Sequence, residues 1–260
     1  MTVGLRLALG QAPAALSGTA ARLAWLDSIL PDVADRADLL LLPELFACGY
    51  NISDAIVTRA ETVDGPTAQA VAARARQYRT AIHYGFAETA PEGLFNAALC
   101  FGPDGMQLSH QRKLAIPPGF ERGYFEAGQG CHLFDFHGLK IATLICYDAE
   151  FPETARHVTG LGAQLVLVPT ALGSDWGWVA NRMIPTRAYE NGVYLAYANS
   201  AGTESGMQFL GCSVIASPDG QEAARAGADP EILFADIDPA RVHVAQARLP
   251  YLTDRARLKF

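Results

Sequence analysis

Short apolar segments recur along the chain, and several are apolar at successive positions rather than at alternate ones. They span residues 4–9, 38–43, 80–86, 95–101, 140–146, 163–169, 193–199 and 231–237. Several are bounded by Gly, Pro or Asp, which interrupt regular structure. Strands that are apolar on both sides are typical of a sheet covered on both faces. The pattern therefore predicts a series of buried strands.

Helical periodicity appears between some of these strands. Residues 14–30 and 67–79 carry apolar side chains at helical spacing, and residues 181–192 form a further predicted helix with Pro185 inside it and Gly192 as its C-cap. Residues 98–114 are predicted to form a hairpin through a Pro-Asp-Gly turn. Helices mixed with hairpins indicate a layered α/β fold with a mixed sheet. Because no linker or repeat interrupts residues 1–260, one domain is expected.

Composition narrows the function classes. The 260 residues are 50% hydrophobic and 18% charged, which suits a packed core. The net charge of −7 argues against nucleic acid or an anionic membrane surface as a partner. No apolar run approaches the roughly 20 residues of a membrane span. Five dispersed cysteines without a CxxC pair favour a reducing, cytoplasmic setting. We therefore expect a soluble cytoplasmic protein.

Cys146 lies where a predicted strand ends and a helix start, marked by Pro152, follows. The partial positive charge of a helix amino terminus stabilises a thiolate, so the position suits a nucleophile. For a cysteine with this context alone, a buried and inert thiol is the better interpretation. The other four cysteines (Cys48, Cys100, Cys131 and Cys212) are explained by packing or lack an apparent partner.

A nucleophilic thiol needs a base, and none of the six histidines falls in a motif that pairs it with a cysteine. Glu44 directly follows an apolar strand and Pro43, where partial desolvation raises a carboxyl pKa toward a useful range. Lys113 ends the predicted hairpin; turned inward it could stabilise an oxyanion, although lysines more often reach water. Glu121 follows in the same loop and could orient the ammonium. Each signal is weak alone.

Taken together, these segments resemble the motifs of the nitrilase, or carbon–nitrogen hydrolase, superfamily. The three motifs stand as LLPELFACGY, RKLAIPPGFERGYF and CYDAEFPE, in the family's order. Further matches are FNAALCFGPDG, VLVPTA and RAYENGVYLAYANSAG. They extend across nearly the whole chain, so chance is a poor explanation.

The resemblance implies a four-layer αββα sandwich with mixed β-sheets and a pocket in which Glu44, Lys113 and Cys146 meet. It implies Glu44 as base, Cys146 as nucleophile, and Lys113 with the backbone N–H of Tyr147 as oxyanion donors. Glu121 would hold Lys113 and the substrate amide. Tyr147, Ala171 and Trp176 are expected to bind substrate, although packing also explains Trp176. No cofactor or metal is implied.

Within the family, Cys-Tyr-Asp at residues 146–148 resembles amidases, whereas nitrilases typically show Cys-Trp-Glu. We therefore expect an amidase for a small primary carboxamide. A nitrilase and an N-carbamoyl-amide hydrolase are alternatives with the same catalytic set. Rivals outside that chemistry are a catalytically silent binding protein on this fold and a thiol redox enzyme. Relatives also imply a homodimer formed through residues 151–162 and 241–260.

Overall fold

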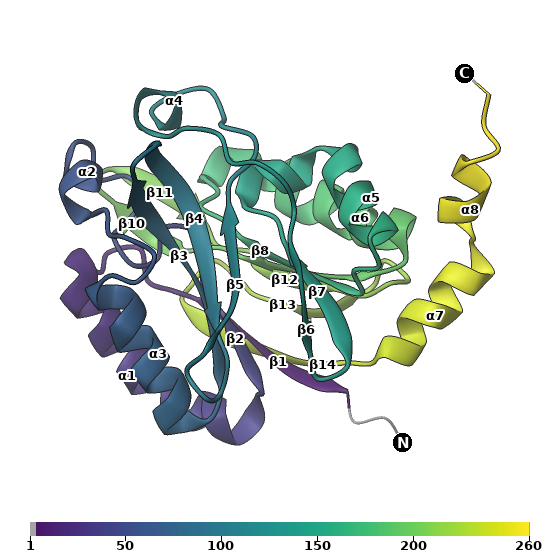
Figure 1. Cartoon of the computed structure of the whole chain (residues 1–260), viewed down its shortest axis with the longest axis horizontal. Coiled ribbons are helices and arrows are strands. Elements are labelled where there is room, and N and C mark those ends of the chain that lie inside the picture. Colours follow the sequence, from purple (N-terminus) through teal and green to yellow (C-terminus); the bar gives the residue numbers. More distant parts are fainter. Residues whose placement is uncertain (1–3, 260) are drawn as a thin grey trace.

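Two six-stranded sheets face each other in the computed structural model, which describes residues 4–259 (Figure 1). The first sheet contains, in order, β14 (Glu231–Ile237), β1 (Leu5–Gln11), β2 (Leu39–Leu41), β3 (Ala81–Ala90), β4 (Gly93–Phe101) and β5 (Gln107–Arg112). The second contains β13 (Glu222–Arg225), β12 (Val214–Ala216), β9 (Tyr194–Ala198), β8 (Leu165–Pro169), β7 (Leu139–Thr143) and β6 (Leu133–Phe136). A separate hairpin joins β10 (Ala201–Glu204) to β11 (Met207–Leu210).

Both sheets are mixed. In the first, β2 pairs in parallel with β1 and β3, and the remaining pairs are antiparallel. In the second, β8 pairs in parallel with β7 and β9, again with antiparallel strands outside. The inner strands of each sheet are fully buried, as expected of parallel strands covered on both faces.

Alternate side chains of each strand enter different layers. Leu5, Leu7 and Leu9 of β1 pack between the sheets, whereas Ala8 packs with the first pair of helices. That pair is α1 (Gly18–Arg36) and α3 (Pro66–Tyr78); α5 (Pro152–Gly160) and α6 (Ile184–Asn191) cover the second sheet. The predicted four-layer αββα sandwich is therefore confirmed (Figure 1).

The remaining helices lie at the rim or after the last strand. Short ones are α2 (Ala55–Arg59), α4 (Glu121–Tyr124), a 3₁₀ helix at Cys146–Glu150 and another at Ser174–Trp176. The C-terminal α7 (Pro239–Arg248) and α8 (Tyr251–Arg255) run out along one side of the body (Figure 1). Among residues 4–259, no helix combines the length and the apolar character that crossing a membrane requires.

All eight predicted strands occur, and β5 forms the second arm of the predicted hairpin, but β10, β11 and β13 were not predicted. The predicted helix at residues 181–192 differs in detail, because a π-helical turn (Val179–Met183) precedes α6. Pro185 thereby falls in the first turn of α6, directly after the π-helical turn. Gly192 ends α6 in the left-handed conformation, as predicted for its C-cap.

Candidate active site

Glu44 is held at the end of β2 by a close backbone contact with β3. Gly85 N–H donates to Pro43 O at 3.2 Å, and Ala47 N–H donates to Gly85 O at 3.0 Å. A Cβ on Gly85 would lie 2.4 Å from Leu45 N and 2.8 Å from Glu44 Cα. Leu45 itself has a positive φ of 48°, a strained conformation for a residue other than glycine. Only glycine at position 85 therefore permits this placement of Glu44.

Lys113 directly follows β5, and its backbone is bonded on both sides. Its N–H donates to Asn96 O at 2.8 Å, and its carbonyl accepts from Gly128 N–H at 2.7 Å. Its Nζ lies 2.7 Å from Glu44 Oε1 and 2.8 Å from Glu121 Oε2. The structure thus brings Glu44, Lys113 and Glu121 together across 77 residues of sequence.

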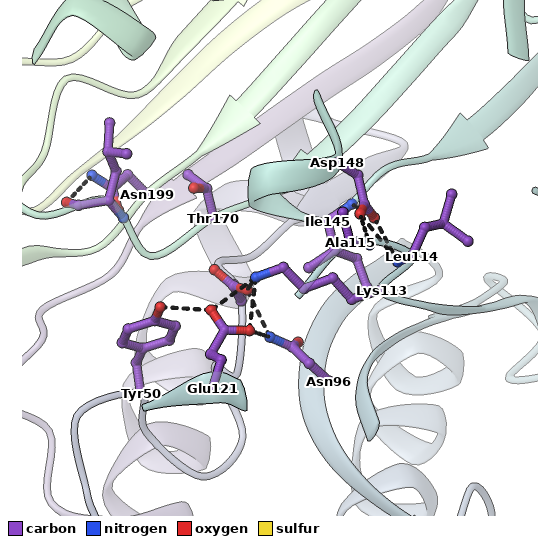
Figure 2. A network of polar contacts seen from close by, with 12 residues as sticks. Tyr50, Asn96, Lys113, Leu114, Ala115, Glu121, Ile145, Asp148, Thr170 and Asn199 are labelled. Carbon is purple, nitrogen blue, oxygen red and sulfur yellow. Dashed lines mark hydrogen bonds and ion pairs between the residues drawn. The ribbon is translucent and has the colours of Figure 1, made fainter. Parts of the chain in front are cut away.

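Two polar side chains complete this cluster (Figure 2). Asn96 Nδ2 donates to Glu44 Oε1 at 2.7 Å and to Glu121 Oε2 at 3.2 Å. Tyr50 donates its hydroxyl proton to Glu121 Oε1 at 2.7 Å. Glu121 is thereby fixed by three donors, whereas Glu44 Oε2 has no hydrogen-bond partner among the described residues. One carboxylate oxygen in the cluster is left free to take a proton.

The charges in the cluster do not balance, because one ammonium lies between two buried carboxyl groups. Burial raises the pKa of Glu44 to about 7; the charge of Glu121 acts in the same direction, while Lys113 opposes both. Burial alone would lower the pKa of Lys113, but the negative groups around it outweigh burial and raise it. Lys113 therefore stays protonated while Glu44 titrates near neutral pH.

Cys146 begins the 3₁₀ helix that follows β7, with a positive φ of 48°. The neighbouring Asp148 fixes this turn. Its carboxylate accepts from Ile145 N–H at 3.0 Å, from Leu114 N–H at 3.1 Å and from Ala115 N–H at 2.8 Å (Figure 2). Asp148 consequently ties the turn of the cysteine to the loop that follows Lys113.

The thiol of Cys146 is protonated at rest. Burial and the charge of Glu44 raise its pKa well above the usual value, and Lys113 offsets this only in part. The expectation that a helix amino terminus stabilises a resting thiolate is therefore wrong here. The following helix has only five residues, and desolvation dominates its weak field. A base is needed to activate this thiol.

A cavity of about 380 Å³ opens at Cys146. The three residues expected to bind substrate, Tyr147, Ala171 and Trp176, all line it. The remaining lining residues are Tyr50, Pro117, Pro118, Glu150, Leu172, Gly173 and Met207. The nearby Trp178 is 73% exposed and lies outside the lining.

Sequence reasoning missed several residues that organise this site. Asn96 and Asp148 stand in recognised motifs, but no pattern shows that their side chains turn toward Glu44 or toward the loop after Lys113. The motif Gly-Tyr gave no indication that Tyr50 reaches Glu121. Within residues 4–259, no three His, Cys, Asp or Glu side chains are grouped so that they could hold a metal ion.

Comparison with known proteins places the chain in a family. The family model of the carbon–nitrogen hydrolases matches residues 6–247. The chain is 40% identical over 254 residues to a protein described as "Hydrolase in pqqF 5'region" from Pseudomonas protegens, covering 96% of this chain and 89% of that one. It is 31% identical to an (R)-stereoselective amidase from a Pseudomonas species, covering 85% of this chain and 81% of that one.

Solved structures agree with the sequence relatives. The crystal structure of an amidase from Nesterenkonia sp. superposes with a TM-score of 0.86 at 33% identity, covering 99% of this chain and 98% of that one. A cysteine-to-alanine mutant of the amidase from Nesterenkonia sp. AN1 is solved in complex with butyramide. A glutamate-to-glutamine mutant of that amidase shows covalent addition of the acetamide moiety of fluoroacetamide at its active-site cysteine.

The chain belongs to the carbon–nitrogen hydrolase family, the nitrilase superfamily. It is a hydrolase that acts on carbon–nitrogen bonds and resembles the amidases of that superfamily. The predicted family and enzyme class are thus confirmed, and the alternative of a silent binding protein finds no support.

Proposed function

We propose that the protein is an amidase that hydrolyses a small primary carboxamide to the carboxylic acid and ammonia. Cys146 is the nucleophile, Glu44 the base, and Lys113 the oxyanion donor. The observation that carries the proposal is the unbonded Oε2 of Glu44 beside a protonated Lys113 in a buried cluster whose charges act on Cys146. The amidase named above from Nesterenkonia sp., with its butyramide complex, supports the substrate class.

The first half of the reaction forms a thioester. Glu44 takes the thiol proton of Cys146 as the sulfur attacks the amide carbonyl carbon. The carbonyl oxygen becomes an oxyanion that accepts from Lys113 Nζ and from the backbone N–H of Tyr147. Because Tyr147 lies in the first turn of a helix, its N–H has no intrahelical acceptor. Protonated Glu44 then gives its proton to the leaving nitrogen, and ammonia departs.

The second half hydrolyses the thioester. Glu44, again ionised, takes a proton from water as the water oxygen attacks the acyl carbon. The tetrahedral oxyanion collapses, the carbon–sulfur bond breaks, and the proton on Glu44 returns to the sulfur. Glu121 transfers no proton. Its bonds to Lys113, Asn96 and Tyr50 instead keep the ammonium in place.

Cys146→Ala tests the covalent route. Ammonia release should fall below detection while circular dichroism and melting temperature stay close to wild type, since a small buried side chain is replaced by a smaller one. Brief exposure of wild type to substrate should leave an acyl mass on the peptide that contains Cys146. Equal turnover by the alanine variant, or a sulfenic acid or disulfide as the intermediate, would contradict the proposal and favour redox chemistry.

Amide and nitrile hydrolysis share the same thiol attack, so substrate panels must separate them. Propionamide, branched, aromatic and ω-carboxylate amides, and chiral amino-acid amides should be compared with matched nitriles and N-carbamoyl compounds. Nitriles should react at least ~10²-fold more slowly, a gap of about 2.7 kcal/mol. Faster turnover of nitriles or N-carbamoyl compounds than of amides would overturn the assignment.

We also propose a homodimer that acts in the reducing cytoplasm. Tyr251 and Leu258 near the C-terminus are exposed, as are Phe151 and Leu161 beside α5, and exposed apolar groups of this kind suit an interface. Val242, which belongs to the segment 241–260 expected at this interface, is instead buried in the core between the sheets. Phe260 lies outside the described residues. Light scattering that finds a monomer at micromolar concentration would count against the dimer.

A further inference from the structure

Glu150 is the only charged residue among the described residues that line the cavity at Cys146. It ends the 3₁₀ helix that Cys146 begins, so the same short helix carries the thiol and this carboxylate. The rest of the lining is apolar or aromatic apart from the thiol and one glycine. A carboxylate in such surroundings requires an explanation, because a partly desolvated charge without a partner is unfavourable.

The Glu150 carboxylate has no partner in the part of the chain that the structure describes. Among residues 4–259, its side chain makes no hydrogen bond and no ion pair, although its backbone carbonyl accepts from Arg187 Nη2 at 2.8 Å. Arg187 Nη1 donates to Glu190 instead, at 3.0 Å. Arg187 therefore fixes the turn while leaving the carboxylate free. Burial raises the pKa of Glu150, and the charges of Lys113 and Arg187 oppose that shift.

The cavity offers no cation to a substrate. No lysine or arginine is among the described residues of its lining. The one ammonium of the adjacent cluster, Lys113, is already shared between Glu44 and Glu121. A substrate carboxylate placed here would face Glu150 without a compensating charge, whereas a substrate ammonium would supply the partner that Glu150 lacks.

We propose that Glu150 selects the substrate by charge, so that short amides whose acyl group carries an ammonium are preferred over neutral amides, and neutral amides over those that carry a carboxylate. This inference rests on the proposed amidase function and assigns its substrate class. The rings of Tyr50 and Trp176, which line the same cavity, provide faces on which an ammonium can also rest.

The placement of the two groups favours a short linker between ammonium and amide. Cys146 begins and Glu150 ends the same five-residue 3₁₀ helix, and both line one cavity of about 380 Å³. Short α- and β-amino amides should therefore be better substrates than amides with a longer chain between the carbonyl and the ammonium.

The test compares three small amides that differ in charge: 3-aminopropanamide, butanamide and succinamate. Wild type should show kcat/KM values in that descending order. Glu150→Gln should lower the ratio of 3-aminopropanamide to butanamide about tenfold, about 1.4 kcal/mol, and raise the relative rate on succinamate. Glu150→Asp, which keeps the charge, should retain the preference for the cation. Glu153→Gln is the matched control, because Glu153 lies just beyond the helix and outside this cavity.

A second measurement needs no variant. Propylammonium should inhibit butanamide hydrolysis by wild type more strongly than propionate or 1-propanol does. An unchanged cation-to-neutral ratio in Glu150→Gln, a wild-type preference for succinamate, or inhibition by propionate above propylammonium would overturn the inference. These outcomes would leave the amidase proposal intact. That proposal would fail if butanamide showed no turnover that depends on Cys146.

Discussion

Two buried carboxylate clusters lie on either side of Tyr50. They differ in how completely the carboxylate oxygens of their central glutamates, Glu204 and Glu44, are hydrogen-bonded. In the cluster around Glu204, every carboxylate oxygen is bonded: Oε1 accepts from Arg22 Nη2 at 2.6 Å, and Oε2 accepts from the backbone N–H groups of Tyr50 and Asn51. In the cluster around Glu44, Oε1 of Glu44 accepts two bonds, and its Oε2 accepts none from the described residues. Both glutamates are almost fully buried.

The comparison shows that burial of a carboxylate does not by itself indicate chemistry. Glu204 accepts hydrogen bonds from one cation and two backbone N–H groups, so its carboxylate has a structural role. Glu44 shares a single cation with Glu121, and its Oε2 has no hydrogen-bond partner among residues 4–259. A buried carboxylate oxygen that accepts no hydrogen bond is available to accept a proton during a reaction. Tyr50 connects the two clusters through its N–H and its hydroxyl.

Glu44→Gln should give the largest loss of activity that the comparison predicts. The amide keeps the shape of the side chain but cannot take the thiol proton, so kcat/KM should fall about 10³-fold, about 4 kcal/mol. The melting temperature should not fall. Steady-state ammonia assays on butanamide measure the effect, and a variant with more than a tenth of wild-type activity would show that Glu44 is not the base.

Glu204→Gln should act on stability instead. It leaves Arg22 buried without its counterion and weakens the hold on the loop that carries Tyr50, so unfolding should become easier by about 3 kcal/mol. Urea unfolding measures the change. The folded fraction should keep kcat within about threefold of wild type, since Glu204 touches no residue that moves a proton. A large kcat loss with unchanged stability would reverse the roles assigned to the two clusters.

The pH dependence follows from the pKa of Glu44, raised to about 7 by burial. Because the base must be ionised, kcat/KM should fall about tenfold per unit below pH 7. The raised pKa also means that the folded protein binds this proton more tightly than the unfolded chain. The stability that this group contributes is thus full below pH 4.5 and lost as pH rises through 7.

Melting temperatures at pH 5 and pH 8 check that sign. Glu44→Gln removes the cost of ionising a buried carboxyl, so its melting temperature relative to wild type should be higher at pH 8 than at pH 5. The Glu204→Gln variant should show no such gain at pH 8. An acid limb near pH 4.5 in the rate profile would mean that the buried cluster does not raise the pKa.

Much of this arrangement could be predicted from sequence, because strands leave a direct signal. Apolar runs such as residues 163–169 predicted β8, and motif order predicted that Glu44, Lys113 and Cys146 would share a site. The short strands β10, β11 and β13 carry little hydrophobic pattern, since each contains residues that are partly or fully exposed. The roles of Asn96 and Glu204 depend on contacts across 52 and 154 residues, which no local pattern encodes. The lack of a partner for the Glu150 side chain among the described residues likewise depends on distant segments that together line the cavity.

Tyr50→Phe should give the smallest effect and shows how far the two clusters depend on each other. The variant keeps the ring and the backbone N–H that Glu204 binds, and removes only the hydroxyl donor to Glu121. Lys113 and Asn96 continue to hold Glu121, so kcat should fall about fivefold, about 1 kcal/mol. Tyr84→Phe is the matched control, because the Tyr84 hydroxyl is buried with no hydrogen-bond partner among residues 4–259. Its loss should leave activity unchanged and stability equal or higher. If Tyr50→Phe is as active as Tyr84→Phe, the bond to Glu121 does not position Lys113. If Tyr50→Phe is instead as destabilised as Glu204→Gln, Tyr50 belongs with the structural cluster, because its hydroxyl then matters for folding more than for the reaction.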